Sequence, residues 1–169
     1  AQKNLQNFEV IETNREHPYN QLLNQAIADF GITKLGFEED YLTMAEYMGY
    51  EKALNAKLVP MNAAIHSFRA VKEPWELEIM RKAQDITDAA FSDVVKRIHA
   101  GMSEKDLQAE LIYCLYKNGA EGLSFDPIVV SGPNTSMPHG VAGDRKLQDG
   151  DFITMDFGVL YKGYCSDMT

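Results

Sequence analysis

The sequence predicts two consecutive domains, an α/β unit followed by an α+β unit. Three observations support this prediction. Helical and extended patterns alternate over residues 18–62, two long amphipathic helical patterns follow over 70–120, and the remainder is rich in strand-forming and turn-forming residues. We place the boundary near residues 66–72 and assign 1–66 to the first domain and 67–169 to the second.

The first part alternates helix and strand. A helix is expected over 18–31 because its apolar residues recur at helical intervals and a glycine follows them. A short strand over 33–39, a second helix over 41–54 and an extended piece over 57–62 complete the pattern. The apolar positions of the first helix are Leu22, Leu23, Ala26, Ile27 and Phe30.

Two amphipathic helices open the second part. The first is expected to run from about residue 70 to Gly101, with Pro74 in its first turn, where the missing N–H group costs nothing. Its apolar stripe consists of Ile79, Ile86, Ala90, Val94 and Ile98. The second helix begins at Ser103, and Asp106 three positions later resembles a capping box. Helices of this length need a sheet or further helices to cover their apolar faces.

The types of residue change after Gly122. Residues 123–132 resemble a strand, residues 133–150 are rich in Pro, Gly, Asn, Ser and Asp, and residues 151–169 are expected to form two strands around a turn. The second part is therefore predicted to be α+β.

The composition excludes several classes of protein. A net charge of −9, with 45% hydrophobic and 24% charged residues, is typical of a globular protein and argues against a nucleic-acid partner. Cys114 and Cys165 are too few for a disulfide framework, and we expect both to be small buried apolar residues. Because no apolar run of about 18 residues occurs, we expect no membrane association and a cytoplasmic location.

Asp156 and Asp167 lie eleven positions apart in a segment that otherwise resembles apolar strand. If a hairpin turns at residues 161 and 162, Asp156 and Asp167 lie directly opposite each other on one face. Opposed carboxylates repel unless a cation lies between them or they share a proton. A shift of the register by one residue would place them on opposite faces. Each aspartate could instead lie on a solvated strand face or cap a turn.

His139 lies in the Pro/Gly-rich segment, seventeen positions before Asp156. Taken alone it would be interpreted as a surface histidine, and His17, His66 and His99 are interpreted as structural. Turn formation explains the polar residues near His139, namely Asp126, Ser131 and Asn134, as well as a binding role does. The D-F-G tripeptide at 156–158 does not indicate a kinase, because no glycine-rich loop or H-R-D stretch precedes it.

Three stretches together resemble one family. "AVKEPWELEIMRKAQDI", "EGLSFDPIVVSGPNTSMPHG" and "GDFITMDFGVLYKGYCSDMT" are similar to the creatinase/aminopeptidase P superfamily of pita-bread metallopeptidases, and most similar to its bacterial Xaa-Pro dipeptidases (prolidases). The resemblance implies that residues 67–169 are the N-terminal half of a pita-bread catalytic domain. It also implies that 1–66 are the C-terminal part of a creatinase-type N-terminal α/β domain, so that the chain is a fragment lacking both ends.

The resemblance also implies an activity, which is hydrolysis of the peptide bond preceding proline in small peptides with proline in second position. Asp156 would chelate one of two divalent metal ions and Asp167 would bridge both, with manganese expected and cobalt or zinc possible. His139 would be a catalytic residue that binds substrate and stabilises the tetrahedral intermediate. The family's remaining ligands, one histidine and two glutamates, follow the S-D-x-T motif. We therefore expect the fragment to bind metal weakly or not at all and to be inactive alone.

Two alternatives to the dipeptidase stay open. An Xaa-Pro aminopeptidase (aminopeptidase P) shares every motif and differs in accepting longer peptides. A non-catalytic binding protein on the pita-bread fold belongs to another class, and such proteins typically lose metal ligands, whereas both aspartates are present here. For the intact enzyme the family resemblance implies a homodimer.

Overall fold

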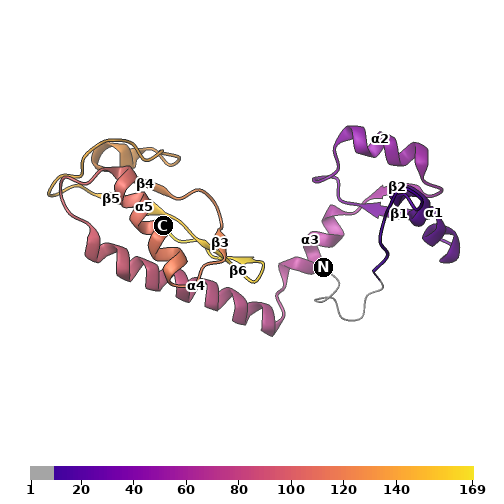
Figure 1. Cartoon of the computed structure of the whole chain (residues 1–169), viewed down its shortest axis with the longest axis horizontal. Helices are drawn as coiled ribbons and strands as arrows, with labels where there is room; N and C mark the ends of the chain where they lie inside the picture. The colour runs from indigo at the N-terminus through magenta and orange to yellow at the C-terminus, as the bar shows by residue number, and fades with distance from the viewer. Residues whose placement is uncertain (1–9) are drawn as a thin grey trace. The chain divides into compact units, whose positions relative to one another are not determined.

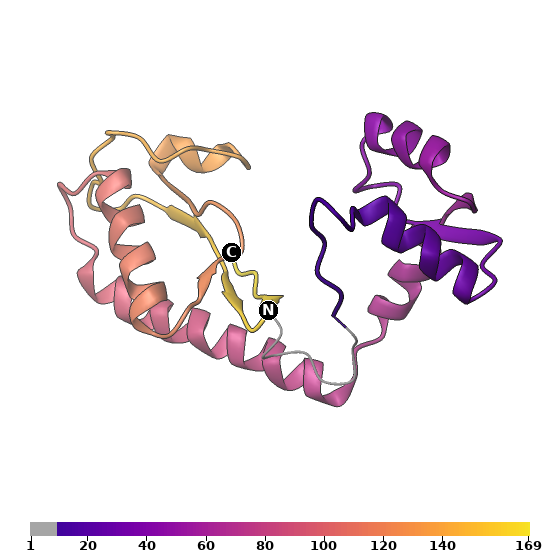
Figure 2. The same cartoon turned by 45° about the vertical axis from the view of Figure 1, so that its right-hand side comes forward.

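The computed structural model describes residues 10–169, which form two compact units that divide after Val71 (Figures 1 and 2). From the sequence the boundary was expected near residues 66–72, with 1–66 assigned to the first domain; residue 66 lies inside a helix of the first unit. Each unit is described by itself below. Within residues 10–169, no helix has both the length and the apolar character needed to cross a membrane.

The first unit is an α/β layer. Its elements are α1 (Tyr19–Asp29), β1 (Lys34–Phe37), α2 (Met44–Ala53), β2 (Lys57–Pro60) and α3 (Asn62–Ala70). Strands β1 and β2 are parallel, so helix α2 forms the crossover that a parallel pair requires. A capping box between Thr43 and Glu46 fixes the start of α2. The alternation expected from the sequence is present, but α3 was not predicted.

The second unit begins with the two predicted helices. Helix α4 (Pro74–Val94) opens with a capping box between Glu73 and Glu76, and α5 (Glu104–Lys117) opens with one between Ser103 and Asp106. The first helix was expected to continue to Gly101, but it ends at Val94 and continues as a short 3-10 turn, η2 (Val95–Arg97).

Strands and a loop complete the second unit. They are β3 (Gly122–Leu123), β4 (Ile128–Ser131), the 3-10 turn η3 (Gly132–Ser136), β5 (Ile153–Asp156), β6 (Val159–Tyr161) and β7 (Tyr164–Cys165). All pairings are antiparallel, with β5 beside β4 and β6 between β3 and β7. Because only two residues separate β5 from β6, the single segment 153–161 pairs with β4 through its first half and with β3 and β7 through its second half.

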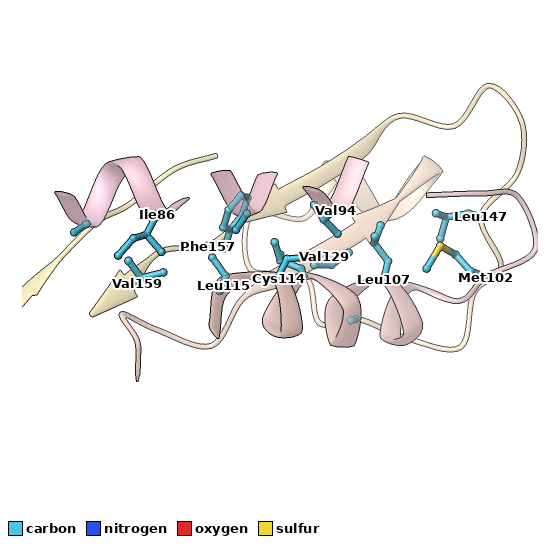
Figure 3. Packing of buried hydrophobic residues seen from close by; sticks show 14 residues of the cluster. Ile86, Val94, Met102, Leu107, Cys114, Leu115, Val129, Leu147, Phe157 and Val159 are labelled. Atoms are coloured by element: carbon cyan, nitrogen blue, oxygen red, sulfur yellow. The ribbon is translucent and has the colours of Figure 1, made fainter. Parts of the chain in front are cut away.

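The core of the second unit lies between the helices and the strands. Figure 3 shows Ile86 and Val94 of α4 and Leu107, Cys114 and Leu115 of α5 close to the strand side chains. Val129 of β4, Val159 of β6 and Phe157, which lies between β5 and β6, are labelled there, and all three are at most 1% exposed. The strands therefore cover the helices with one face.

The two cysteines differ. Cys114 is fully buried in this core, and burial raises the pKa of its thiol. Cys165 is exposed, so the expectation that both cysteines are buried is wrong for this one. Its side chain lies on the strand face that does not contact the helices.

Candidate functional site

Asp156 is the last residue of β5, where it pairs with Ile128 of β4. Its side chain is half-buried, and the Thr169 hydroxyl donates a hydrogen bond of 3.0 Å to its Oδ1 atom. Strand pairing on one side and Thr169 on the other therefore define the place of this carboxylate.

The hairpin that carries Asp167 turns at Lys162 and Gly163, which both have positive φ, 47° and 82°. Two such residues form a type I′ turn, whose twist matches that of the flanking strands. Pairing then joins Leu160 with Cys165 and Phe157 with Met168. The predicted turn at 161 and 162 is wrong, and the register is displaced by two positions.

The displacement moves Asp167 without changing its face. Asp156 now lies opposite Thr169, and Asp167 lies opposite Gly158. Because side chains alternate along a strand with period two, a shift of two keeps Asp156 and Asp167 on the same face. They are diagonal neighbours, typically about 7–8 Å apart between Cα atoms. The two carboxylates therefore share a face as predicted, but they are not directly opposed.

The segment bearing Asp167, which follows β7, is held at the preceding residue. Ser166 is buried, and its hydroxyl lies 2.5 Å from the Thr87 hydroxyl of α4 and accepts a 2.9 Å hydrogen bond from the Val159 N–H group. Gly158 permits the close approach, because a Cβ atom there would lie 1.9 Å from the Ser166 carbonyl oxygen. These contacts fix the backbone from which the Asp167 side chain leaves.

His139 lies in the loop between β4 and β5, over the same face. The neighbouring Gly140 is buried, and a Cβ atom there would lie 2.8 Å from Val130 Cγ1. Val130 pairs with Thr154, so both point to the Asp156 face, whereas Val129 points to the helices. The loop therefore covers part of the sheet beside Asp156.

A cavity of about 410 Å³ adjoins this loop. His139 and Ile128, the strand partner of Asp156, both line it, together with Gln108 and Ile112 of α5. Asp126 also lines the cavity and is exposed. The three candidate residues thus come from the loop before β5 (His139), from the end of β5 (Asp156) and from the segment after β7 (Asp167), on one face of the second unit.

Sequence reasoning missed one buried charged residue near the site. Glu104, the first residue of α5, is 0% exposed and its carboxylate accepts hydrogen bonds from Ser131, Asn134 and Gly143. Burial by itself raises the pKa of Glu104, but these hydrogen bonds outweigh burial and hold the pKa below its ordinary value. The sequence signal was an acidic residue after a capping serine, which normally indicates an exposed helix start.

An ion pair stabilises the same loop. The Arg145 guanidinium donates to both oxygens of Asp151, at 2.6 and 3.0 Å, and to the Ser131 hydroxyl at 2.7 Å. The hydrogen bonds from Arg145, together with the Gln148 N–H group, hold the pKa of Asp151 below its usual range. Both ends of the loop therefore join a network of charged side chains.

The donor atoms on the exposed face suit a hard divalent cation, which prefers carboxylate oxygens. Asp156 and Asp167 supply two such groups. Within residues 10–169 no group of three or more His, Cys, Asp or Glu side chains lies close enough to hold a metal ion. The two aspartates therefore fit a part of a metal site that needs further ligands.

Sequence comparison assigns both units. Residues 78–169 match metallopeptidase family M24, and residues 1–71 match the creatinase/prolidase N-terminal domain. The chain belongs to metallopeptidase family M24. Its fold is accordingly the creatinase N-terminal domain followed by the pita-bread domain of the M24 peptidases, as the sequence predicted.

Curated relatives of this M24 chain are peptidases. It is 38% identical over 174 residues to the uncharacterized peptidase YqhT of Bacillus subtilis, a match that spans 100% of this chain and 48% of that protein. It is 35% identical over 140 residues to the Xaa-Pro dipeptidase of Pyrococcus horikoshii, covering 82% of this chain and 40% of that one. The M24 chain thus spans less than half the length of these relatives.

Solved structures agree with this assignment. The Xaa-Pro dipeptidase from Bacillus anthracis superimposes with a TM-score of 0.82 at 40% identity, over 88% of this chain and 41% of that chain. The X-Pro aminopeptidase from Thermotoga maritima gives a TM-score of 0.89 at 34% identity, over 98% and 47%. The similarity thus covers less than half of each of these two enzymes.

Proposed function

We propose that this chain is part of a metal-dependent Xaa-Pro dipeptidase, which hydrolyses the peptide bond preceding proline in small peptides, and that residues 67–169 form the N-terminal half of its catalytic domain. The observation that carries the proposal is the placement of Asp156 and Asp167 as diagonal neighbours on one face of a hairpin. The names of relatives such as the Pyrococcus horikoshii enzyme supply the substrate class.

In this proposal Asp156 and Asp167 hold two divalent ions together with ligands from the rest of the enzyme. Manganese is the proposed metal, with cobalt and zinc as alternatives. Bound ions of this kind polarise a carbonyl group and lower the pKa of a water molecule toward neutrality. We further propose that the intact enzyme is a homodimer and resides in the cytoplasm.

His139 is proposed to hydrogen-bond the substrate carbonyl oxygen as negative charge develops on it. Such a donor typically contributes about 3–4 kcal/mol to transition-state stabilisation. Support comes from the loop position, since His139 and the strand partner of Asp156 line one cavity. An exposed ring beside a cavity is accessible to a peptide.

An Xaa-Pro aminopeptidase is the second candidate. The observation favouring it is the similarity to the Thermotoga maritima X-Pro aminopeptidase, which extends over 98% of this chain. Substrate length separates the two candidates, because a dipeptidase requires the carboxylate directly after proline and an aminopeptidase accepts further residues. A binding protein without activity would take up peptide and leave it intact.

The test is performed on the longer protein that contains this chain. We expect manganese-dependent cleavage of Ala-Pro and little cleavage of Ala-Pro-Ala, whereas the reverse preference would favour the aminopeptidase. Asp167→Asn should lose at least one metal ion, measured by elemental analysis, and nearly all turnover. Asp149→Asn, an exposed change between η3 and β5, is the matched control and should retain both. Full metal content and turnover in Asp167→Asn would contradict the proposal.

A further inference from the structure

Glu104 differs from the other acidic residues at helix starts in this molecule. It is 0% exposed, whereas Glu46 in the first turn of α2 and Glu76 in the first turn of α4 are exposed or half-buried. A charged side chain is almost never fully buried unless its charge is satisfied by partners. The partners of Glu104 therefore indicate what its burial achieves.

The partners lie at both ends of one loop. Glu104 Oε1 accepts from the Ser131 N–H group at 2.8 Å, the Ser131 hydroxyl at 2.9 Å and the Asn134 amide at 3.0 Å. Glu104 Oε2 accepts from the Gly143 N–H group at 2.9 Å. Ser131 is the residue that enters the loop, and Gly143 is where it returns. One carboxylate thus closes the segment 131–143.

Backbone contacts reinforce the closure. The Glu104 N–H group donates to the Arg145 carbonyl at 3.1 Å, and the Lys105 N–H group donates to the Gly143 carbonyl at 3.2 Å. A side chain at position 143 would meet Glu104 Oε2, because a Cβ atom there would lie 3.4 Å away. The start of α5 therefore carries the returning end of the loop by main-chain and side-chain bonds together.

His139 lies between these two anchored ends. Its side chain is exposed, so the packing of surrounding side chains does not enclose the ring. The position of the ring follows from the backbone, which is seated on Val130 through Gly140 and tied at both ends to Glu104. Any movement of the tied ends would carry the ring away from the Asp156 face.

We propose that Glu104 is a positioning residue, which closes the 131–143 loop with four hydrogen bonds and thereby places His139 beside the Asp156–Asp167 face. The kinetic part of this inference depends on the proposed function, while the structural part does not. Glu104 does not line the cavity beside His139, so in this proposal it acts through the loop.

The first experiment measures amide hydrogen exchange in this chain. Glu104→Gln keeps the size of the side chain but replaces one carboxylate oxygen by an NH₂ group, which cannot accept a hydrogen bond, and the other by a neutral, weaker acceptor. We expect exchange at Gly140 and Gly143 to accelerate at least about tenfold relative to the core amide of Phe157, since hydrogen bonds to a charged group are lost. Glu110→Gln, on the same helix and paired with Arg97, is the matched control and should leave the loop unchanged.

The second experiment is a double-mutant cycle in the longer enzyme. Glu104→Gln should lower kcat for an Xaa-Pro substrate roughly ten- to hundredfold, the effect of a misplaced group, with KM little changed. In a His139→Ala background the same change should lower kcat less than about twofold, because its effect passes through the ring. Additive losses would overturn the inference, because a general loss of stability does not depend on His139.

A milder variant covers the case in which Glu104→Gln does not fold. Asn134→Ala removes one of the four hydrogen bonds and leaves the Glu104 charge satisfied by the others. It should also accelerate exchange at Gly140, by a smaller factor than Glu104→Gln does.

Loop exchange that is unchanged in both folded variants would overturn the inference. If the longer protein cleaves no peptide while loop exchange accelerates as expected, the proposed function fails and the loop closure by Glu104 stands.

Discussion

Gly158 illustrates how one residue without a side chain determines the spacing of the two aspartates. It lies directly opposite Asp167 and two positions after Asp156, on the shared face. Any Cβ atom there would lie 1.9 Å from the Ser166 carbonyl oxygen and 2.4 Å from the Ser124 hydroxyl. The tripeptide D-F-G therefore has a structural meaning, since its glycine lets the neighbouring strand approach.

We expect Gly158→Ala to destabilise the second unit by about 1–3 kcal/mol, the usual effect of forcing extra atoms into a packed site. The backbone of Ser166 cannot move away without loss of its bond to Thr87. Urea unfolding of the variant checks this. Gly122→Ala on the adjacent strand is the control, because a Cβ atom there makes ordinary contacts of 3.6 Å with Leu160. Equal midpoints for the two variants would contradict the close-approach argument.

Motifs in the sequence indicated candidate residues but not their geometry. Asp156, Asp167 and His139 were proposed from motifs, whereas the register of the hairpin depends on the backbone of Lys162, a residue that seldom adopts positive φ. Glu104 was missed because its partners Ser131 and Gly143 are 27 and 39 positions away, and no local pattern connects them. Cys165 was misjudged because alternation along β7 places it on the open face.

At the scale of elements, the helices were predictable because their apolar stripes are local. Helices α4 and α5 start where Pro74 and Ser103 indicate. Helix α3 was missed because its nine residues are fewer than the span over which a helical pattern is assigned from sequence, and because it adjoins the expected domain boundary. Local periodicity thus identified the long helices, and long-range contacts determined the strand pairing and the loop.

The hairpin turn offers a test at this scale. Lys162 has φ of 47°, a conformation that disfavours most side chains by roughly 1–2 kcal/mol, whereas Asn tolerates it. We expect Lys162→Asn to stabilise the second unit by about 0.5–1 kcal/mol in thermal or urea unfolding. Lys162→Val, with a branched Cβ, should destabilise it instead. A gain in stability for Val would show that the turn has another geometry.

The loop network predicts a pH dependence. The folded-state pKa values of Glu104 and Asp151 are both lowered, so unfolding takes up protons at acidic pH. The stability that these groups contribute is fully present above their unfolded pKa values, about 4.3 and 3.9, and is lost as pH falls through the lower folded values. The urea concentration at the unfolding midpoint of the second unit should therefore decrease as the pH is lowered from 6 to 3, with the decrease beginning at about pH 4.

A variant isolates the contribution of Asp151 to this pH dependence. Asp151→Asn removes the Arg145 ion pair and should flatten the acidic limb of the stability curve, at the cost of lower stability at neutral pH. Asp149→Asn, two positions away and exposed, should leave the slope unchanged. The same slope in Asp151→Asn and in the unaltered chain would refute the assignment.

At the scale of the whole molecule, the two units have different means of stabilisation. The large apolar cluster lies entirely within the second unit. Among the described residues of the first unit, the buried apolar side chains are Ile27 and Leu54, and a cavity of about 400 Å³ adjoins its strands. Burial of apolar area is the main source of folding free energy, so the first unit should be the less stable one.

We expect two unfolding transitions on heating, the first from the unit up to Val71 and the second from residues 72–169. Leu107→Ala should lower the midpoint temperature of the second transition only, because it leaves a cavity in the cluster and reduces the unfolding free energy of that unit by about 2–5 kcal/mol. Ile27→Ala should lower the midpoint temperature of the first transition only. Calorimetry of both variants decides, and a single transition that both substitutions shift equally would disprove independent units.

The hairpin around Lys162 and Gly163 also bears on the order of events during synthesis. Its pairing connects residues close in sequence, and α4, which holds Ser166 through Thr87, precedes it in the chain. Because domains fold progressively as they leave the ribosome, Asp156 and Asp167 would be set at their final spacing while later segments of the proposed enzyme are still being made. Metal capture would then complete folding rather than nucleate it, and the nascent enzyme would acquire its ions only when the last ligands arrive.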